Sequence, residues 1–140
     1  MYLLDTNVIS ELRKAKPHRA VQAWLESARE SDLHISAVTM GEIQRGIEIT
    51  QEQNPARARE IEEWANRLEA THTILPLDSR IMRVWAQLMH PKSTDKSDDM
   101  YEDAIIAATA LVHDLTVVTR NVGDFAQLKA GVFNPFGASK

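Results

Sequence analysis

The chain has 140 residues, of which 44% are hydrophobic and 26% are charged, a composition typical of an ordinary globular protein. This length suits one hydrophobic core, so we expect a single domain over residues 1–140. The sequence contains no cysteine, which excludes a disulfide framework, a thiolate metal site and a cysteine nucleophile. No segment stays apolar for the about 18 residues of a membrane helix, so we expect a soluble, cytoplasmic protein without a membrane partner. The net charge of −4 excludes binding to polyanions through bulk positive potential.

Short apolar segments alternate along the chain with longer segments of helical periodicity. Five segments are typical of buried strands: Tyr2–Leu4, Leu33–Ile35, Thr73–Leu75, Leu115–Val118 and Val132–Phe133. Apolar side chains repeat at helical spacing in three stripes, namely Val21, Trp24, Leu25 and Ala28; Ile61, Trp64, Ala65 and Leu68; and Ile81, Val84, Trp85 and Leu88. The polar stretch from Lys92 to Asp99 is typical of an exposed loop between two helices. The alternation predicts an α/β fold whose parallel sheet is covered by helices on both faces.

Acidic residues lie shortly after several of the expected strands. Ligands of open α/β sheets bind at the carboxyl ends of the strands, where such side chains would meet. Asp5 follows the first strand directly, and Glu42 lies in a helix that begins soon after the second strand. Asp103 is expected to open the apolar helix over residues 104–112, and Asp124 lies a few residues past the fourth strand. Four acids are therefore expected to converge at one edge of the sheet.

Each of these acids also has a structural interpretation. Asp5 could form an Asx turn, and Glu42 could complete a capping box with Thr39 as the cap residue. Asp124 could be a favourable first-turn charge of a helix that begins near residue 121. Asp103 is the hardest to explain in this way, because an unpaired acid on a buried helix is costly unless a cation neutralises it.

A group of carboxylates without matching cysteine or histidine ligands favours a particular class of metal ion. Hard oxygen ligands suit Mg²⁺ or Mn²⁺ and are a poor set for Zn²⁺. Such an ion binds phosphate oxygens, lowers the pKa of a bound water and offsets negative charge in the transition state. The pattern therefore favours a phosphodiester as the substrate.

Four segments resemble, in chain order, the motifs of VapC-type PIN-domain toxins. They are Leu3–Ser10, Ser36–Glu42, Asp103–Ala110 and Val118–Phe125. The closing segment Val132–Phe136 is similar to the tail of the FitB-like branch of that family. Each motif alone is common, but together they span almost the whole chain in the family's order and spacing.

The resemblance implies a PIN-domain-like α/β/α sandwich with a central, mostly parallel five-stranded sheet, and a Mg²⁺-dependent endoribonuclease in which Mn²⁺ can substitute. It implies that the metal is held by the four acids named above: Asp5, Glu42, Asp103 and Asp124. Thr6, Thr119 and Asn121 match positions that support these acids by hydrogen bonds, and Arg120 matches a possible contact to RNA phosphate. Glu102 stands beside Asp103, so a small rotation of the helix would present either acid.

The resemblance also implies partners. Toxins of this type are neutralised by a small antitoxin with a DNA-binding domain, whose C-terminal segment covers the acidic site. They commonly form homodimers, and they bind promoter DNA only through the antitoxin. We expect the antitoxin to extend an Arg or Lys toward the acids and to cover apolar surface around Ile9, Leu12 and Trp24.

Three further features admit simpler interpretations. The basic run Arg13–Arg19 is typical of a solvated turn between two helices, with steering of RNA backbone as its functional alternative. The three tryptophans fall within apolar stripes, which favours packing over base stacking. The five histidines have no metal-ligand spacing.

Two other functions remain open from the residues. A haloacid-dehalogenase-like phosphatase also places an Asp after its first strand but needs a second Asp two residues later, where this chain has Asn7. A non-catalytic, receiver-like interaction domain would need a phosphorylatable Asp in mid-chain, a role open to Asp78. It would also need a Lys after a later strand, and none follows Val118 directly.

Overall fold

The computed structural model describes residues 1–90 and 98–137, and its centre is a five-stranded, entirely parallel sheet. The strands are β1 (Tyr2–Leu4), β2 (Leu33–Ser36), β3 (Thr73–Leu75), β4 (Thr116–Val118) and β5 (Val132–Phe133), in the order β3-β2-β1-β4-β5. All five predicted strands are confirmed, although β2 extends to Ser36 and β4 begins one residue later than expected. The chain winds outward from β1 in both directions, so β1 and β4 are neighbours across the switch point of the sheet, where α/β proteins bind their ligands.

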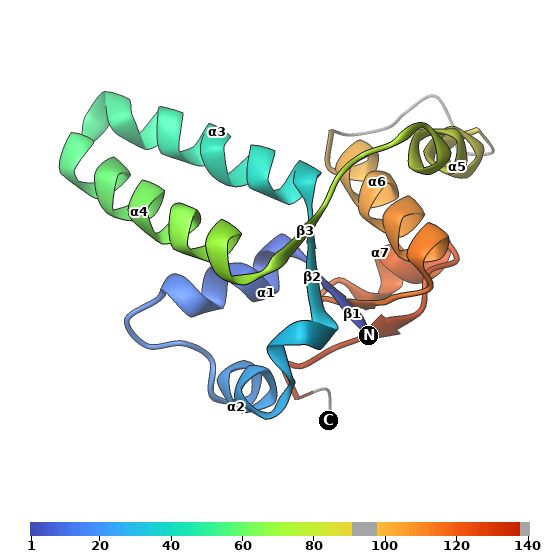
Figure 1. Ribbon diagram of the computed structural model, residues 1–140, viewed down its shortest axis with the longest axis horizontal. Coiled ribbons are helices and arrows are strands. Elements are labelled where there is room, and N and C mark those ends of the chain that lie inside the picture. Colours follow the sequence, from blue (N-terminus) through green and yellow to red (C-terminus); the bar gives the residue numbers. More distant parts are fainter. Residues whose placement is uncertain (91–97, 138–140) are drawn as a thin grey trace.

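Helices cover both faces of the sheet, as predicted (Figure 1). One face carries α1 (Thr6–Ile9), the 3₁₀ helix η1 (Ser10–Arg13), α2 (Arg19–Ser27), α3 (Ala37–Gln53) and α4 (Pro55–Thr71). A further 3₁₀ turn, η2 (Glu30–Asp32), leads into β2. The other face carries α5 (Ser79–Met89), α6 (Asp98–His113) and α7 (Val122–Gln127). Within the described ranges, no helix is both long and apolar enough to cross a membrane.

The core is divided into two layers by the alternation of side chains along the strands. Leu3 and Val117 are buried on the side of α5, α6 and α7, where Phe125 is fully enclosed. Leu4 and Val118, their immediate neighbours in the chain, are buried on the opposite side among α1, α2 and α4. Successive residues of a strand point to opposite faces, so strands of three residues anchor both helical layers.

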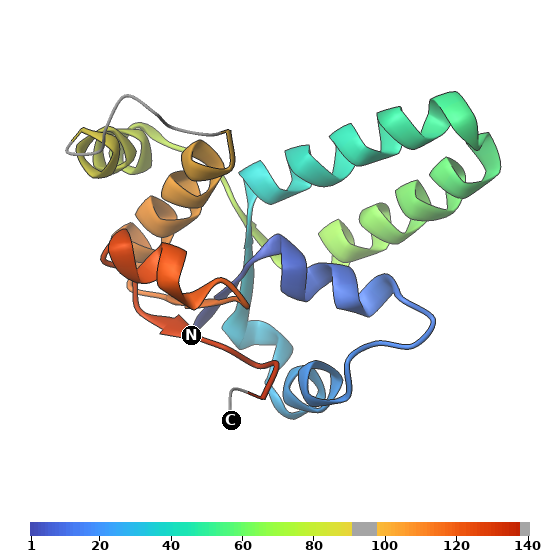
Figure 2. The same ribbon diagram turned by 180° about the vertical axis from the view of Figure 1, so that it is seen from behind.

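The helices α3 and α4 form a long antiparallel hairpin that projects from the sheet (Figures 1 and 2). Asn54 separates them and caps α4, because its side chain accepts a hydrogen bond of 3.1 Å from the backbone N–H of Arg57. Pro55 occupies the first turn, where its missing N–H is not needed. Ile47, Ala58 and Ala65 close the seam between the two helices.

The start of α6 differs from the prediction. Asp103 does not open this helix, because α6 begins at Asp98 and places Asp103 in its second turn. The expected start lay at the boundary between polar and apolar residues, but a helix can begin before its apolar segment, because local preference sets helix ends only weakly. The part of the predicted loop from Lys92 to residue 97 lies outside the described residues, while Asp98 and Asp99 belong to the helix. The apolar helix over residues 104–112, expected to be buried, is not buried throughout, because Leu111 is 41% exposed.

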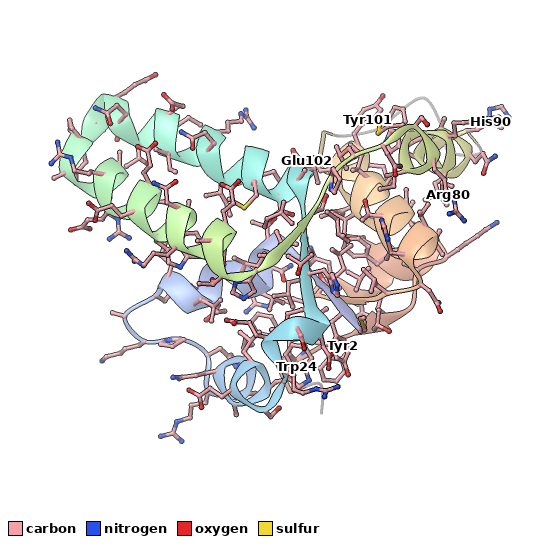
Figure 3. The ribbon with its side chains drawn as sticks, in the orientation of Figure 1. Tyr2, Trp24, Arg80, His90, Tyr101 and Glu102 are labelled. Atoms are coloured by element: carbon pink, nitrogen blue, oxygen red, sulfur yellow. The ribbon has the colours of Figure 1, made fainter. Side chains whose placement is uncertain are left out.

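The early helices expose less apolar surface than the sequence suggested. Ile9, expected on a partner-binding surface, is fully buried in the core, because α1 is a single turn pressed against the sheet. Leu12 is exposed, and Trp24 is half-buried against the ring of Tyr2, with ring centroids 5.0 Å apart (Figure 3). The predicted surface around these helices is therefore confined to Leu12 and the outer edge of Trp24.

The basic run lies between η1 and α2, as predicted, and a buried acid anchors it. Glu11 is only 4% exposed. Its carboxylate accepts hydrogen bonds from the ammonium group of Lys14 at 2.6 Å and from the backbone N–H of His18 at 2.8 Å. These two donors lower the pKa of Glu11. The turn is thus held to the body of the protein by one carboxylate that the sequence analysis did not single out.

Glu11→Gln should lower the free energy of unfolding by about 1–2 kcal/mol at neutral pH, because charge-assisted hydrogen bonds are replaced by weaker neutral ones. The folded-state pKa lies below the ordinary value of 4.5, so this contribution is complete above that value and is lost as the pH falls through the lowered one. Denaturant melts of both proteins over a pH series would measure the difference. Glu62→Gln, on an exposed face of α4, should leave the free energy of unfolding unchanged at every pH. A loss of stability in Glu11→Gln that persists at low pH would contradict the role given to the Glu11 carboxylate.

Candidate active site

Asp5 lies at the carboxyl end of β1, where its carboxylate is held by three donors. Its Oδ1 accepts a hydrogen bond of 2.8 Å from the backbone N–H of Thr6, which caps α1. Its Oδ2 accepts a hydrogen bond of 2.8 Å from the hydroxyl of Thr119 and one of 3.3 Å from the amide of Asn7. The backbone N–H of Asp5 donates to the carbonyl of Val118. The carboxylate therefore joins the ends of β1 and β4 and has little freedom to rotate.

Burial makes this carboxylate electrostatically costly. Asp5 is 5% exposed, and desolvation raises its pKa, although the hydrogen bonds from Thr119 and Thr6 partly oppose the shift. None of the ion pairs formed by the described residues involves Asp5. A buried carboxylate without a counter-charge is stabilised when a cation binds beside it. The site is therefore set up to favour a cation.

Glu42 does not serve as a helix cap, contrary to the structural alternative. The cap of α3 is Ser36, whose hydroxyl accepts a hydrogen bond of 3.1 Å from the backbone N–H of Val38, and Thr39 is fully buried inside the first turn. The carboxylate of Glu42 instead accepts a hydrogen bond of 2.8 Å from the hydroxyl of Thr6. Because the backbone of Thr6 donates to Asp5, this one threonine links the two acids.

The residues predicted to converge line one open hollow of about 350 Å³. Its walls come from four segments of the chain and consist of Asp5, Thr6, Asn7, Glu42, Glu102, Asp103, Asn121 and Asp124. The four predicted acids thus come together, and Glu102 joins them as a fifth. Figure 3 shows Glu102 on α6 beside the beginning of α3. Five acids in one hollow create a strongly negative potential that repels phosphate unless cations enter first.

The supporting residues occupy distinct places around the hollow. Thr119 is fully buried beneath it and accepts a hydrogen bond of 2.9 Å from the backbone N–H of Asn121 while donating to Asp5. Asn121 precedes α7 without capping it through its side chain, and Asp124 lies in the first turn, as predicted. The amide of Asn7 contacts both Asp5 and Thr119, a clamp that the sequence analysis did not single out.

Arg120 points away from the acids. Its guanidinium carbon lies 4.0 Å from the centre of the Phe136 ring, and Arg120 is not among the residues that line the hollow. Its backbone N–H donates to the side-chain oxygen of Asn7 at 3.3 Å. In this structure Arg120 therefore supports the C-terminal segment and the Asn7 clamp, and contact with phosphate would require its side chain to swing over.

The donor set fits a hard divalent cation, because the hollow offers carboxylate, hydroxyl and amide oxygens and no histidine. The acids are spread around its rim. Among the residues that the structure describes, no three acidic or histidine side chains are grouped closely enough to hold one ion. Mg²⁺ keeps several waters and commonly uses only one or two carboxylates together with substrate phosphate, so a wide acidic rim suits it.

Comparison with known proteins assigns the chain and its fold to a family. A model of the PIN domain matches residues 2–130. The chain belongs to the PIN-domain family. It is 37% identical to the toxin FitB of Neisseria gonorrhoeae over 97% of this chain and 99% of that protein. It is also 37% identical to the VapC ribonuclease Y4jK of Sinorhizobium fredii, over 97% of this chain and 98% of the relative.

Solved structures agree with the sequence relatives. The structure of FitAcB from Neisseria gonorrhoeae superposes with a TM-score of 0.84 at 34% identity, covering 99% of this chain and 100% of that chain. The structure of FitAB bound to a DNA fragment gives 0.78 at 34% identity, covering 100% and 99% of the two chains. The PIN domain is thus a VapC-type toxin of the FitB-like branch, and ribonucleases of this family are generally metal-dependent. Both alternatives, the phosphatase and the receiver-like domain, are thereby excluded.

Asp5→Asn should raise the melting temperature of the metal-free PIN domain by roughly 2–4 °C, the shift that about 1 kcal/mol produces in a domain of this size, because it removes a desolvated charge. The same variant should lose most of the rise that Mn²⁺ causes in the wild type, since a ligand stabilises in proportion to its binding to the folded state. Asp78→Asn, which keeps a cap residue at the start of α5, should change neither value. A less stable Asp5→Asn with an undiminished metal response would remove Asp5 from the cation site.

Proposed function

We propose that this PIN domain is the toxin of a toxin–antitoxin pair and hydrolyses RNA phosphodiester bonds with Mg²⁺ or Mn²⁺. The ion would bind in the hollow that Asp5, Glu42, Asp103 and Asp124 line, with one or two of these acids contacting it directly. The observation that carries the proposal is the buried, three-fold hydrogen-bonded carboxylate of Asp5 opening into a hollow with the other three acids. The similarity to relatives named as a toxin and as a VapC ribonuclease supports it independently.

The chain's own residues hold the reacting groups in place. Thr119, Asn7 and the backbone of Thr6 fix both oxygens of Asp5, so its orientation does not change when a ligand arrives. Thr6 also orients Glu42. A bound divalent ion supplies a water of lowered pKa and offsets the charge that develops on the phosphate. Preorganised carboxylates avoid the cost of reorientation during the reaction.

The negative charge around the hollow makes a cation necessary for RNA to bind there. Like charges repel strongly where water is partly excluded, so five acids around one hollow disfavour the approach of an RNA phosphate. A divalent cation held among these acids would offset part of their charge and would offer the phosphate a positive partner. We therefore expect RNA binding at this site, as well as cleavage, to require the divalent ion.

Asp5→Asn and Asp103→Asn should each reduce RNA cleavage by at least about 100-fold, because each keeps the side-chain shape and removes one anionic ligand. Thr119→Val should reduce it by about 10- to 100-fold, since it frees Asp5 without removing a charge. Cleavage of single-stranded RNA would be followed in chelator and after Mg²⁺ or Mn²⁺ is restored, with Asp78→Asn as the control. Activity that survives chelator, or near wild-type rates in both Asn variants, would contradict the proposal.

The partner proposed for this toxin is an antitoxin that covers the acidic hollow. An acidic hollow is blocked most simply by a cation from another chain, so we propose that an antitoxin Arg or Lys reaches toward Asp5 and Asp103 in place of the metal. The structure of FitAB bound to a DNA fragment supports an assembly that includes DNA. We propose that within it the antitoxin contacts promoter DNA and the toxin forms a homodimer.

In the toxin–antitoxin complex, Mn²⁺ should no longer raise the melting temperature of the toxin, because the antitoxin's cation occupies the acidic hollow. Differential scanning calorimetry of the free toxin and of the complex would compare the two metal responses. An antitoxin in which the Arg and Lys residues near the C-terminus are replaced by Gln should restore part of the rise in melting temperature that Mn²⁺ causes. A complex that retains the full response would show that the hollow stays open to metal.

A further inference from the structure

A groove continues from the acidic hollow between the α1–η1 segment and the α3/α4 hairpin. Its first part, a hollow of about 190 Å³, shares Thr6 and Glu42 with the acidic site and ends at Arg13 and Trp64. Its second part, of about 250 Å³, shares Arg13 and Trp64 with the first. The α1–η1 segment runs beside α4 in both views of the ribbon (Figures 1 and 2). Because neighbouring hollows share lining residues, the three hollows lie in a row that leads away from the acids.

The far end of this groove carries the opposite charge. Three arginines line it, Arg13, Arg57 and Arg67, against one acid, Glu60. Arg57 and Glu60 are 3.7 Å apart and both well exposed, so their pairing is weak and leaves the guanidinium available. A chain of net charge −4 thus places a local positive cluster at the end of a groove that begins at its most acidic site.

Trp64 holds one of these arginines in place. The guanidinium of Arg13 lies 5.7 Å from the centre of the Trp64 ring, within the range of a cation–π interaction. The ring itself is half-buried against the core, so it forms a rigid support. The tryptophan is therefore a packing residue on one side, as predicted, and a support for Arg13 on the other.

A glycine lines the middle of the groove. Gly46 lies inside α3 and lines the groove, and a Cβ atom added there would meet nothing within 4 Å. Glycine weakens a helix interior relative to alanine, so helix stability does not account for it. The missing side chain leaves room for a ligand between the acidic hollow and the arginines.

We propose that this groove binds the ribose–phosphate backbone of single-stranded RNA as it leaves the acidic site, with Arg13, Arg57 and Arg67 contacting phosphates and Trp64 positioning Arg13. The inference rests on the proposed ribonuclease function and adds the form of its substrate. Charge complementarity favours RNA, because the acids need a cation and the arginines need anions along one path. A duplex is read across a wide, shallow surface, whereas this groove offers one narrow row of guanidinium groups.

The first test compares two arginine pairs with the same change in net charge. R13Q/R67Q removes two groove arginines, and R59Q/R80Q removes two exposed arginines outside the groove, of which Arg80 points away on α5 (Figure 3). Binding of a single strand of about 12 nucleotides would be measured by fluorescence anisotropy over a salt series, with Mn²⁺ and in an Asp103→Asn background that prevents cleavage. Binding falls as salt rises, and R13Q/R67Q should make this fall less steep. The magnitude of the slope of log K against log salt should decrease by about 1.4, since each phosphate contact on a single strand contributes about 0.7. R59Q/R80Q should leave the slope unchanged.

The second test fills the groove. Gly46→Gln should weaken binding of the single strand at least about tenfold, the loss expected when one backbone contact and its neighbours are displaced. Gly41→Gln, on the same helix and with equally open space at its Cβ, should not. Gly46→Ala should raise the melting temperature slightly and bind RNA almost normally, which separates groove filling from damage to α3.

Cleavage assays separate this proposal from the proposed function. With otherwise wild-type protein and Mn²⁺, the groove variants should lose cleavage of the 12-nucleotide strand through a higher KM and keep cleavage of a dinucleotide, which reaches only the acidic hollow. A wild type that cleaves neither substrate would refute the nuclease function. The anisotropy series would still show whether the groove binds single-stranded RNA. Three results would overturn the proposal. They are equal slopes for the two arginine pairs, tighter binding of duplex than of single strand, and groove variants that bind RNA normally but escape inhibition by the antitoxin.

Discussion

The hydrogen bond between Thr119 and Asp5 joins the two halves of the molecule at the point where its chemistry is expected. It connects the end of β4 to the end of β1, across the boundary from which the sheet grows in opposite directions. The carboxylate must be buried to be reached from both strands, and burial raises its pKa. The interaction that closes the centre of the sheet therefore also creates the demand for a cation. Replacing Asp5 by a neutral residue would therefore raise the stability of the fold and abolish activity at the site. Such a trade between stability and activity is expected of an active site.

The architecture follows closely from the sequence because its signals are local. Tyr2–Leu4 and Thr116–Val118 are short apolar runs, and a strand buried on both faces needs nothing else to be recognised. The helical stripes of α2, α4 and α5 were equally plain, since each buries one face. Helix ends were less predictable. The start of α6 at Asp98 depends on whether polar residues before an apolar run join the helix, and local preference decides this only weakly.

The candidate site shows where sequence reasoning reaches its limit. The order of Asp5, Glu42, Asp103 and Asp124 after strands and helices was enough to expect one acidic cluster. The sequence could not decide whether Glu42 belongs to a capping box or to the acidic cluster. Ser36 and Thr39 are both acceptable cap residues, and Ser36 caps α3 because β2 ends there. Side-chain direction was equally hidden. Arg120 stacks on Phe136 because the C-terminal segment returns beside β4, a contact between distant parts of the chain that no local pattern encodes.

The distribution of charge joins the site to the hairpin. An acidic hollow alone would capture a cation and then present it to any phosphate, whatever molecule carried that phosphate. The α3/α4 hairpin adds a direction, because α3 starts at the acids with Glu42 and α4 carries arginines to the far end of the groove. The turn through Asn54 and Pro55 lies next to Arg57, whose backbone N–H donates to the Asn54 side chain, so this turn places one arginine at the far end of the groove. A substrate long enough to touch both ends would gain contacts that a dinucleotide lacks, so the hairpin would convert simple charge attraction into a preference for an extended strand over a short one.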